Sequence, residues 1–290
     1  MIPLIFSILC SSLIFVIFKL FPKYQIDTFQ AIVFNYFTAF ICGIALFGDE
    51  WKSQALSTGN WPMFVVLSGV LFISLFLLMG KSSQQNGVAL TSIAVKMSMA
   101  ISMLFMIVLY KESLSVLKIT GIALAILGVF LVSFSQSDEK KVNSAVWMLF
   151  FLFVGSGFLH FILNYVQRYE LHFLTPSLFS AFGFGVAGLI GLGSLIFQIR
   201  TGKTTFSPRS ILAGIVLGIP NYFSIFLLML SYKSTGWNDS TVLAITNVSV
   251  VILAALVGFL AFKENVTVRK ILGLLAAIAA IVILYFANNL

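Results

Sequence analysis

The sequence predicts an all-α integral membrane protein, in which ten transmembrane helices form two inverted five-helix repeats. Three observations lead to this prediction. First, 60% of the 290 residues are hydrophobic and 9% are charged, and the mean hydropathy is +1.08; soluble domains carry roughly a quarter charged residues. Second, ten stretches reach the length of roughly 20 apolar residues that a bilayer-spanning helix needs. Third, the two halves of the chain repeat one another.

The ten predicted spans are 2–21, 29–47, 61–82, 87–109, 115–135, 145–167, 174–199, 208–232, 239–262 and 267–287. The first span is long enough to be a retained helix and lacks the basic n-region of a cleaved signal peptide. Residues 1–135 form the first predicted repeat, 136–144 a hydrophilic linker and 145–290 the second repeat. Five spans in each half reverse the direction in which the second half enters the membrane. The connectors are short, so we expect function to reside within the helical bundle.

The internal duplication appears as short motifs that recur at one spacing. Lys81 and Lys233 are 152 residues apart (233 − 81), and the other motifs keep this offset. A period of half the chain indicates a duplicated module, since solenoid repeats are far shorter. The matching motifs are Lys81-Ser82 with Lys233-Ser234, Asn86 with Asn238, Lys111-Glu112 with Lys263-Glu264, and Lys118-Ile119-x-Gly121 with Lys270-Ile271-x-Gly273.

The net charge of +8 comes from basic residues scattered singly through short loops. This pattern is typical of membrane flanks that contact anionic headgroups, so we expect the lipid bilayer and not a nucleic acid as the partner. Loops on the side opposite both termini hold eleven Lys and Arg, and loops on the side of the termini hold five. The positive-inside rule then places both termini outside the cytoplasm.

Lys96 is the first candidate for a substrate-binding residue. It lies near the middle of the fourth span, whereas all nine acidic residues lie in loops or at span ends. A charged lysine at the centre of a span costs about 2.5–3.5 kcal/mol on insertion scales. Its side chain is expected to attract a substrate carboxylate or phosphate, or to exchange a proton as a desolvated amine. The alternative is that it reaches towards the membrane surface or bonds to Ser92.

Uncharged polar side chains in other spans are further candidates. His160 and Asn164 in the sixth span are four residues apart and share a helix face. Asn247 is aligned with Val95, the neighbour of Lys96, by the 152-residue offset. The whole set is Asn35, His160, Asn164, Asn221 and Asn247. Such side chains either line a cavity or bond a neighbouring helix. Pro220 also predicts a kink in the eighth span.

No pattern in the sequence favours an enzyme. It shows no nucleophile and base pairing, no phosphate-binding loop and no metal-ligand spacing, so we expect no catalytic residue, no metal and no cofactor. The two cysteines, Cys10 and Cys42, lie in apolar runs where a disulfide is not expected. The Lys111-Glu112 and Lys263-Glu264 pairs are interpreted as turns before the last helix of each repeat, with Ser115 and Thr267 as N-caps.

These features resemble those of the drug/metabolite transporter superfamily, in particular its EamA-like ten-span type. The resemblance rests on the duplicated five-span layout and on the motif Lys-Glu-x-Leu/Val-Ser/Thr-x-x-Lys-Ile-x-Gly before spans five and ten. It implies secondary transport of small metabolites, often amino-acid export, through a central cavity lined by spans one, three, four, six, eight and nine. Lys96, His160, Asn164, Asn221 and Asn247 fall on those spans, and Asn35 does not. The family's cytoplasmic termini conflict with the loop charges above.

Small multidrug-resistance relatives of this superfamily work through a glutamate in the first span, and this chain has none there. We therefore expect an anionic or zwitterionic substrate in place of a cationic drug. The sequence hypothesis is a multi-pass inner-membrane transporter, acting as a monomer or homodimer, in which Lys96 binds the acidic group of a small polar metabolite. His160, Asn164, Asn221 and Asn247 are the expected neutral donors and acceptors. A non-transporting membrane scaffold or assembly protein is the alternative hypothesis.

Overall fold

The computed structural model describes residues 1–51, 59–110, 115–133, 139–170, 175–234 and 239–289. Every regular element in these ranges is a helix, which confirms the predicted all-α class. The α-helices are α1 (Ile2–Leu20), α2 (Thr28–Phe47), α3 (Trp61–Gln85), α4 (Val88–Met97), α5 (Met99–Tyr110), α6 (Val116–Ser133), α7 (Glu139–Tyr169), α8 (Pro176–Arg200), α9 (Pro208–Ser234), α10 (Asp239–Leu260) and α11 (Val268–Asn289). Two short 3₁₀ helices, η1 (Phe21–Tyr24) and η2 (Gly48–Glu50), follow α1 and α2.

Seven of the described helices are long and apolar enough to cross a membrane, which makes the chain a membrane protein: α1, α2, α3, α7, α8, α9 and α11. Three shorter apolar stretches, Val88–Ser102, Val116–Gly128 and Ile245–Leu260, coincide with the remaining predicted spans. Ten crossings and the inversion of the two halves stay predictions. Helix α7 begins at Glu139, inside the segment 136–144 predicted as a linker.

The predicted fourth span, 87–109, is interrupted at one residue, Ser98, whose backbone keeps helical angles (φ −56°, ψ −17°). Helix α4 ends at Met97, Ser98 is a turn residue and α5 begins at Met99. The Ser98 hydroxyl donates to the Val95 carbonyl at 2.6 Å. A serine side chain that bonds a carbonyl of the preceding turn competes with the regular hydrogen bonds of a helix. The interruption of the apolar stretch at Ser98 lies two residues after Lys96.

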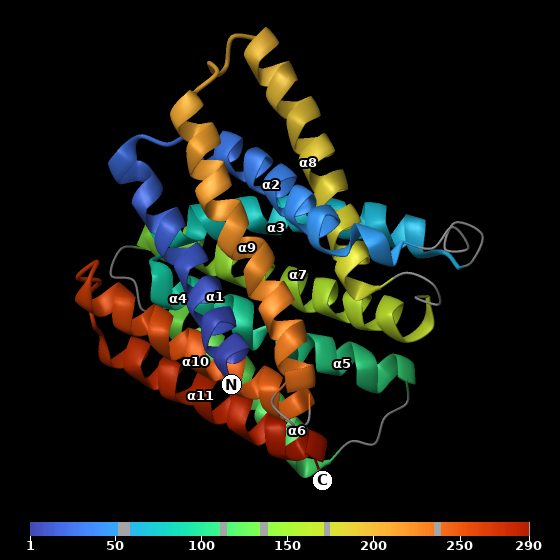
Figure 1. Cartoon of the computed structure of the whole chain (residues 1–290). Coiled ribbons are helices and arrows are strands. Elements are labelled where there is room, and N and C mark those ends of the chain that lie inside the picture. The colour runs from blue at the N-terminus through green and yellow to red at the C-terminus, as the bar shows by residue number, and fades with distance from the viewer. Residues whose placement is uncertain (52–58, 111–114, 134–138, 171–174, 235–238, 290) are drawn as a thin grey trace. The chain divides into compact units, whose positions relative to one another are not determined.

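The helices divide into two compact units that both draw on the two halves of the chain. Unit 1 consists of Met1–Lys19, Leu78–Phe161 and Leu227–Leu290, and unit 2 of Leu20–Leu77 and Ile162–Phe226. In unit 1, α6 packs along α11, and α10 contacts both α4 and α11; α10 and α11 run side by side in Figure 1. A Cβ atom on Gly128 would lie 3.2 Å from the Gly273 carbonyl oxygen, so glycine permits the close approach of α6 and α11.

Unit 2 is centred on the packing of α2 against α8. Tyr36 of α2 is buried, donates its hydroxyl proton to the Phe72 carbonyl at 2.6 Å and stacks on Phe184. Two glycines of α9 allow its close approach to α2. A Cβ atom on Gly218 would lie 2.7 Å from the Asn35 carbonyl oxygen, and a Cβ atom on Gly214 would lie 2.5 Å from the Ala31 carbonyl oxygen. Pro220 lies inside α9 and does not end the helix.

A buried polar network closes one end of unit 2. The Gln30 side chain, 1% exposed, donates to the Thr205 carbonyl at 2.8 Å and accepts from the Ser207 backbone N–H at 3.0 Å. It also donates to the Asp27 carboxylate and to the Thr204 hydroxyl. Since buried polar groups are stable only when they are hydrogen-bonded, this network fixes the start of α2 to the segment between α8 and α9.

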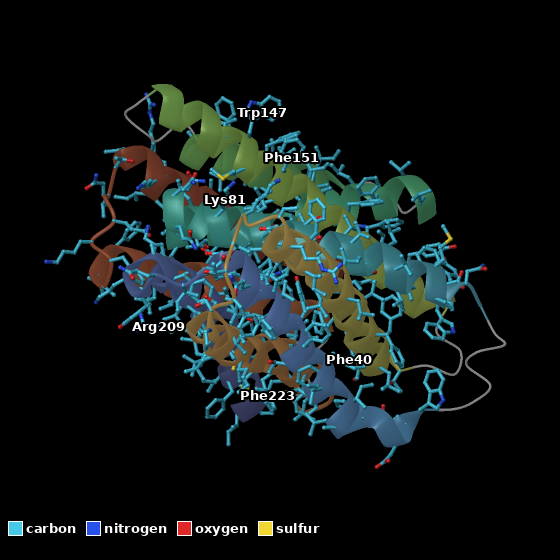
Figure 2. All side chains as sticks on the ribbon, turned by 90° about the horizontal axis from the view of Figure 1, so that it is seen from above. Phe40, Lys81, Trp147, Phe151, Arg209 and Phe223 are labelled. Carbon is cyan, nitrogen blue, oxygen red and sulfur yellow. The ribbon has the colours of Figure 1, made fainter. Side chains whose placement is uncertain are left out.

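Local signals in the sequence fix several helix ends. The Ser115 hydroxyl accepts from the Lys118 N–H at 3.2 Å and the Thr267 hydroxyl from the Lys270 N–H at 3.3 Å, which confirms both predicted N-caps. On the outer surface of unit 1, Trp147 and Phe151 stack at 5.8 Å between ring centroids and point away from α7 (Figure 2). Both are more than half exposed, as is typical of aromatic side chains that face lipid.

Candidate functional site

The break between α4 and α5 is the centre of the candidate site, which lies within unit 1. At such a break the C-terminal carbonyls of one helix lie beside the N-terminal amides of the next, and neither set has its full complement of intrahelical partners. The backbone of Ser98 keeps helical angles (φ −56°, ψ −17°), so the interruption is confined to one residue. Discontinuous helices carry substrate sites in some transporters, which makes this position a candidate for one.

Lys96 lies in the last turn of α4 and is half-buried. Among the described residues, no carboxylate forms an ion pair with it. The Ser92 hydroxyl, one turn earlier, donates to the Ala89 carbonyl at 2.8 Å, and no hydrogen bond joins Lys96 to Ser92 in the part of the chain that the structure describes. Lys96 therefore carries an ammonium group that has no ion-pair or hydrogen-bond partner among the described residues, on the last turn of α4.

His160 of α7 faces the break from a second helix. Its Nδ1 lies 3.4 Å from the Ser98 hydroxyl oxygen. The Ser98 proton is already donated to Val95, so in this contact the oxygen is the acceptor and Nδ1 carries the proton. In a neutral imidazole the other nitrogen, Nε2, is then a hydrogen-bond acceptor. The side chain is exposed, and it is close enough to Lys96 for their charges to interact.

Gly157 sets the distance between α7 and the break. A Cβ atom on this glycine would lie 2.6 Å from the Ser98 carbonyl oxygen and 2.5 Å from the Ile101 Cβ atom. Gly157 is one turn before His160 on the same helix. The missing side chain thus lets α7 approach closely enough for the His160 ring to reach Ser98.

Asn247 brings α10 to the same place. Its side chain is 7% exposed and donates to the Met99 sulfur at 3.5 Å. Met99 is the first residue of α5, so this contact lies on the other side of the break from Lys96. Three of the five predicted residues, Lys96, His160 and Asn247, therefore converge on one helix break within unit 1.

The other two predicted residues belong to unit 2. The Asn221 amide donates to the Asn35 side-chain oxygen at 3.2 Å, and both side chains are buried. Asn221 thus joins α9 to α2, and one of its polar groups is committed to that bond. Asn164 of α7 is exposed. Asn164 follows His160 by four residues on α7, but His160 belongs to unit 1, which ends at Phe161, and Asn164 belongs to unit 2.

Sequence reasoning missed the parts played by Ser98, Met99 and Gly157. The break has no strong local signal, because residues on both sides of Ser98 are apolar helix formers. The run Gly155-Ser156-Gly157 in the sixth predicted span was the available signal, since small residues mark close helix approaches.

Comparisons with known proteins agree with the fold. Residues 2–134 match the model of the EamA-like transporter family. A curated protein of Haemophilus influenzae (strain Rd), named only as uncharacterized, is 29% identical over 294 residues, which cover 99% of this chain and 98% of the relative. The crystal structure of another protein is similar, with a TM-score of 0.61 and 14% identity over 98% of this chain and 97% of the solved chain. At that identity the likeness concerns the fold alone.

Proposed function

We propose, on the match of residues 2–134 to the EamA-like transporter family, that this chain is a secondary transporter of small polar metabolites. The proposed substrate is anionic or zwitterionic, such as an amino acid, and the proposed mechanism is alternating access around a central cavity. Its proposed location is the cell inner membrane, where it acts as a monomer or homodimer.

The observation that carries this proposal is the placement of Lys96 at the end of α4, two residues before the break and without an ion-pair partner among the described residues. The ammonium group of Lys96 carries a full positive charge and the N-terminus of α5, three residues later in the chain, a partial one. Both charges suit a substrate carboxylate. The C-terminal carbonyls of α4 and Nε2 of His160 are acceptors, which suit the ammonium group of a zwitterion.

A non-transporting membrane scaffold is the second candidate, and one observation favours it. Asn221 and Asn35 bond each other across two helices of unit 2. Interhelical amide bonds of this kind stabilise a bundle without any ligand. The proposed substrate site therefore consists of Lys96, His160 and Asn247 of unit 1, and Asn221 is assigned to helix packing within unit 2.

The test is a ligand thermal-shift panel on the purified protein in detergent, run beside the variant Lys96→Met. The panel spans amino acids, organic acids, sugar phosphates, nucleotide sugars and cationic dyes. A ligand present at 100 times its Kd adds about 2.7 kcal/mol to the stability of the folded state. Lys81→Met is the matched control, since Lys81 is an exposed lysine of α3 in the same unit.

We expect one anionic or zwitterionic class to stabilise the wild-type protein and the Lys81→Met variant, and to have no effect on Lys96→Met. Stabilisation by cationic dyes alone would overturn the assignment of the substrate class. The absence of any stabilising ligand, together with unchanged melting of Lys96→Met, would favour the scaffold.

A further inference from the structure

A second polar cluster of unit 1 lies at the other end of α4. The first residue of this helix, Val88, donates its backbone N–H to Oε1 of Glu264 at 2.7 Å. Glu264 belongs to the turn between α10 and α11, 176 residues along the chain. The helix has a glycine, Gly87, at its N-cap position, and glycine has no side chain with which to cap. Glu264 therefore serves as the capping side chain of a helix in the other half of the chain.

Two glycines, Gly87 and Gly258, leave room for the Glu264 carboxylate. Gly87 has φ of +100°, and a Cβ atom there would lie 2.5 Å from Oε2. A Cβ atom on Gly258 would lie 2.8 Å from the same oxygen. Any side chain at either position would displace the carboxylate. The cradle thus fits one acidic group from the α10–α11 turn and holds it against the start of α4.

Two lysines from different helices add charge to this contact. Lys19, near the end of α1, lies 3.6 Å from Oε1 of Glu264, and its Nζ also donates to the Gln84 carbonyl of α3 at 3.3 Å. Lys270 of α11 is near enough for its charge to interact with that of Glu264, and its Nζ donates to the Asn265 carbonyl at 2.7 Å. Two cations and the N-terminus of α4 therefore surround one carboxylate, and each of them attracts its negative charge.

One oxygen of the Glu264 carboxylate, Oε2, is buried without a hydrogen-bond donor among the described residues, which lowers the stability of the cluster. The Glu264 side chain is 7% exposed, yet no described residue donates a hydrogen bond to its Oε2. A buried carboxylate oxygen without a donor is a cost to the closed arrangement. Lys19, in contrast, is 22% exposed and keeps contact with solvent. Separation of the pair returns both charges to water, which offsets part of the attraction that is lost.

We propose that Glu264 is a positioning residue that fixes the start of α4, and that it forms with Lys19 a latch that opens and closes one end of unit 1 during transport. The latch joins α1, the end of α3, the start of α4 and the α10–α11 turn. Lys96 and the break at Ser98 lie at the opposite end of α4, so release of the helix start changes the freedom of the helix that carries the candidate site. The purpose of the latch rests on the proposed transport function.

The test is hydrogen–deuterium exchange of backbone amides on the purified full-length protein. The exchange rate of each peptide reports the free energy of local opening in that segment. The variants are Lys19→Met, which removes the cation, and Glu264→Gln, which keeps an oxygen for Val88 and removes the charge. Glu170→Gln is the matched control. Glu170 also accepts a backbone N–H at a helix start, that of Asn60 at 2.6 Å, but this contact is exposed.

For a latch we expect exchange to accelerate at least tenfold in both variants, at three places together: residues 17–19 of α1, the start of α4 at residues 88–91, and the turn 261–267. In Glu170→Gln these three segments keep the wild-type exchange rate. A fixed cap predicts a different result, in which Glu264→Gln and Lys19→Met change no segment or only the amide of Val88, and this result would overturn the latch.

Size-exclusion profiles show whether each variant is folded. If Lys19→Met fails to fold, Glu264→Gln decides the matter with the same three segments, because its amide retains the contact with Val88. The measurement needs no substrate. Failure of the ligand panel therefore leaves the latch standing, and uncoupled exchange at the three segments leaves the transport proposal standing.

Discussion

Nδ1 of His160 lies 3.4 Å from the Ser98 hydroxyl oxygen, at the residue where α4 gives way to α5. This contact joins a helix of the second half of the chain to the break in a helix of the first half. It also sets the tautomer of the imidazole, because the Ser98 proton is donated to Val95. The acceptor nitrogen of His160 and the ammonium group of Lys96 are thereby available at one place in unit 1.

The tautomer leads to a prediction that separates two roles of His160. His160→Asn places an amide donor near the position of Nδ1 and loses the acceptor at Nε2, whereas His160→Gln keeps an acceptor near the position of Nε2. We expect either variant to lose at most about 1.5 kcal/mol of unfolding free energy, the usual contribution of one hydrogen bond. The Kd of the ligand found in the panel should rise at least tenfold in His160→Asn and less in His160→Gln. Equal affinity in all three proteins would mean that His160 does not contact the substrate.

Gly157→Ala tests whether the approach of α7 determines the geometry of the break. The added methyl group would meet the Ser98 carbonyl oxygen, a backbone atom that cannot move alone. We expect a loss of about 1–3 kcal/mol in the free energy of unfolding, as for other overpacked sites, and a weaker ligand shift, measured by thermal melting with and without ligand. Gly193→Ala is the control, because no atom lies within 4 Å of a Cβ there. Equal stability of the two variants would contradict the close approach.

Gln30→Ala is expected to destabilise the protein without changing ligand affinity. The substitution leaves the Ser207 N–H and the Thr205 carbonyl without their present partner. Thr205 is exposed and Ser207 is half-buried, so water can reach both freed groups, and each lost hydrogen bond costs about 0.5–1.5 kcal/mol. Melting should therefore occur at a lower temperature while the ligand Kd stays at the wild-type value. Thr201→Ala, in the same connection but with an exposed hydroxyl, is expected to remain within about 0.5 kcal/mol. A change in ligand affinity would show that the network reaches the site.

The helical architecture could be predicted from the sequence because the length of each apolar stretch determines whether it can form a membrane-spanning helix. Stretches of roughly 20 apolar residues have few other stable arrangements, and the helix ends at Ser115 and Thr267 have a local capping signal. The 152-residue offset also aligned Asn247 with Val95, the neighbour of Lys96, and in the structure Asn247 contacts Met99, three residues after Lys96. Periodicity and duplication therefore carried information about the site as well as about the fold.

Polar contacts between residues far apart in the chain could not be predicted from the sequence. The sequence predicts a turn at Lys263-Glu264, which the structure confirms, but it does not predict that Glu264 caps a helix that begins 176 residues earlier. Nothing near Glu264 in the chain specifies that partner. The break at Ser98 was also missed, because a serine within an apolar stretch is compatible with a continuous helix until the contacts of its hydroxyl are known.

The Asn35–Asn221 pair allows a test of whether Asn221 binds substrate or only joins two helices. In Asn221→Leu the Asn35 side-chain oxygen loses its donor in a buried position, and Asn35 Nδ2 has no hydrogen-bond acceptor among the described residues even now. We expect this variant to lose about 1–3 kcal/mol of unfolding free energy. Adding Asn35→Leu should recover much of that loss, because replacing both partners by apolar groups is close to neutral. A double-mutant cycle measured by thermal or denaturant unfolding gives the coupling energy.

Ligand binding by the same double variant then decides the role of Asn221. If the amide only joins α9 to α2, the recovered protein binds the ligand of the panel with wild-type affinity, and the substrate site is confined to Lys96, His160 and Asn247. If affinity falls at least tenfold while stability is restored, Asn221 contacts the substrate, and the hydrogen bond to Asn35 orients its amide. Because stability and affinity are measured on one folded protein, a folding defect cannot imitate the second result.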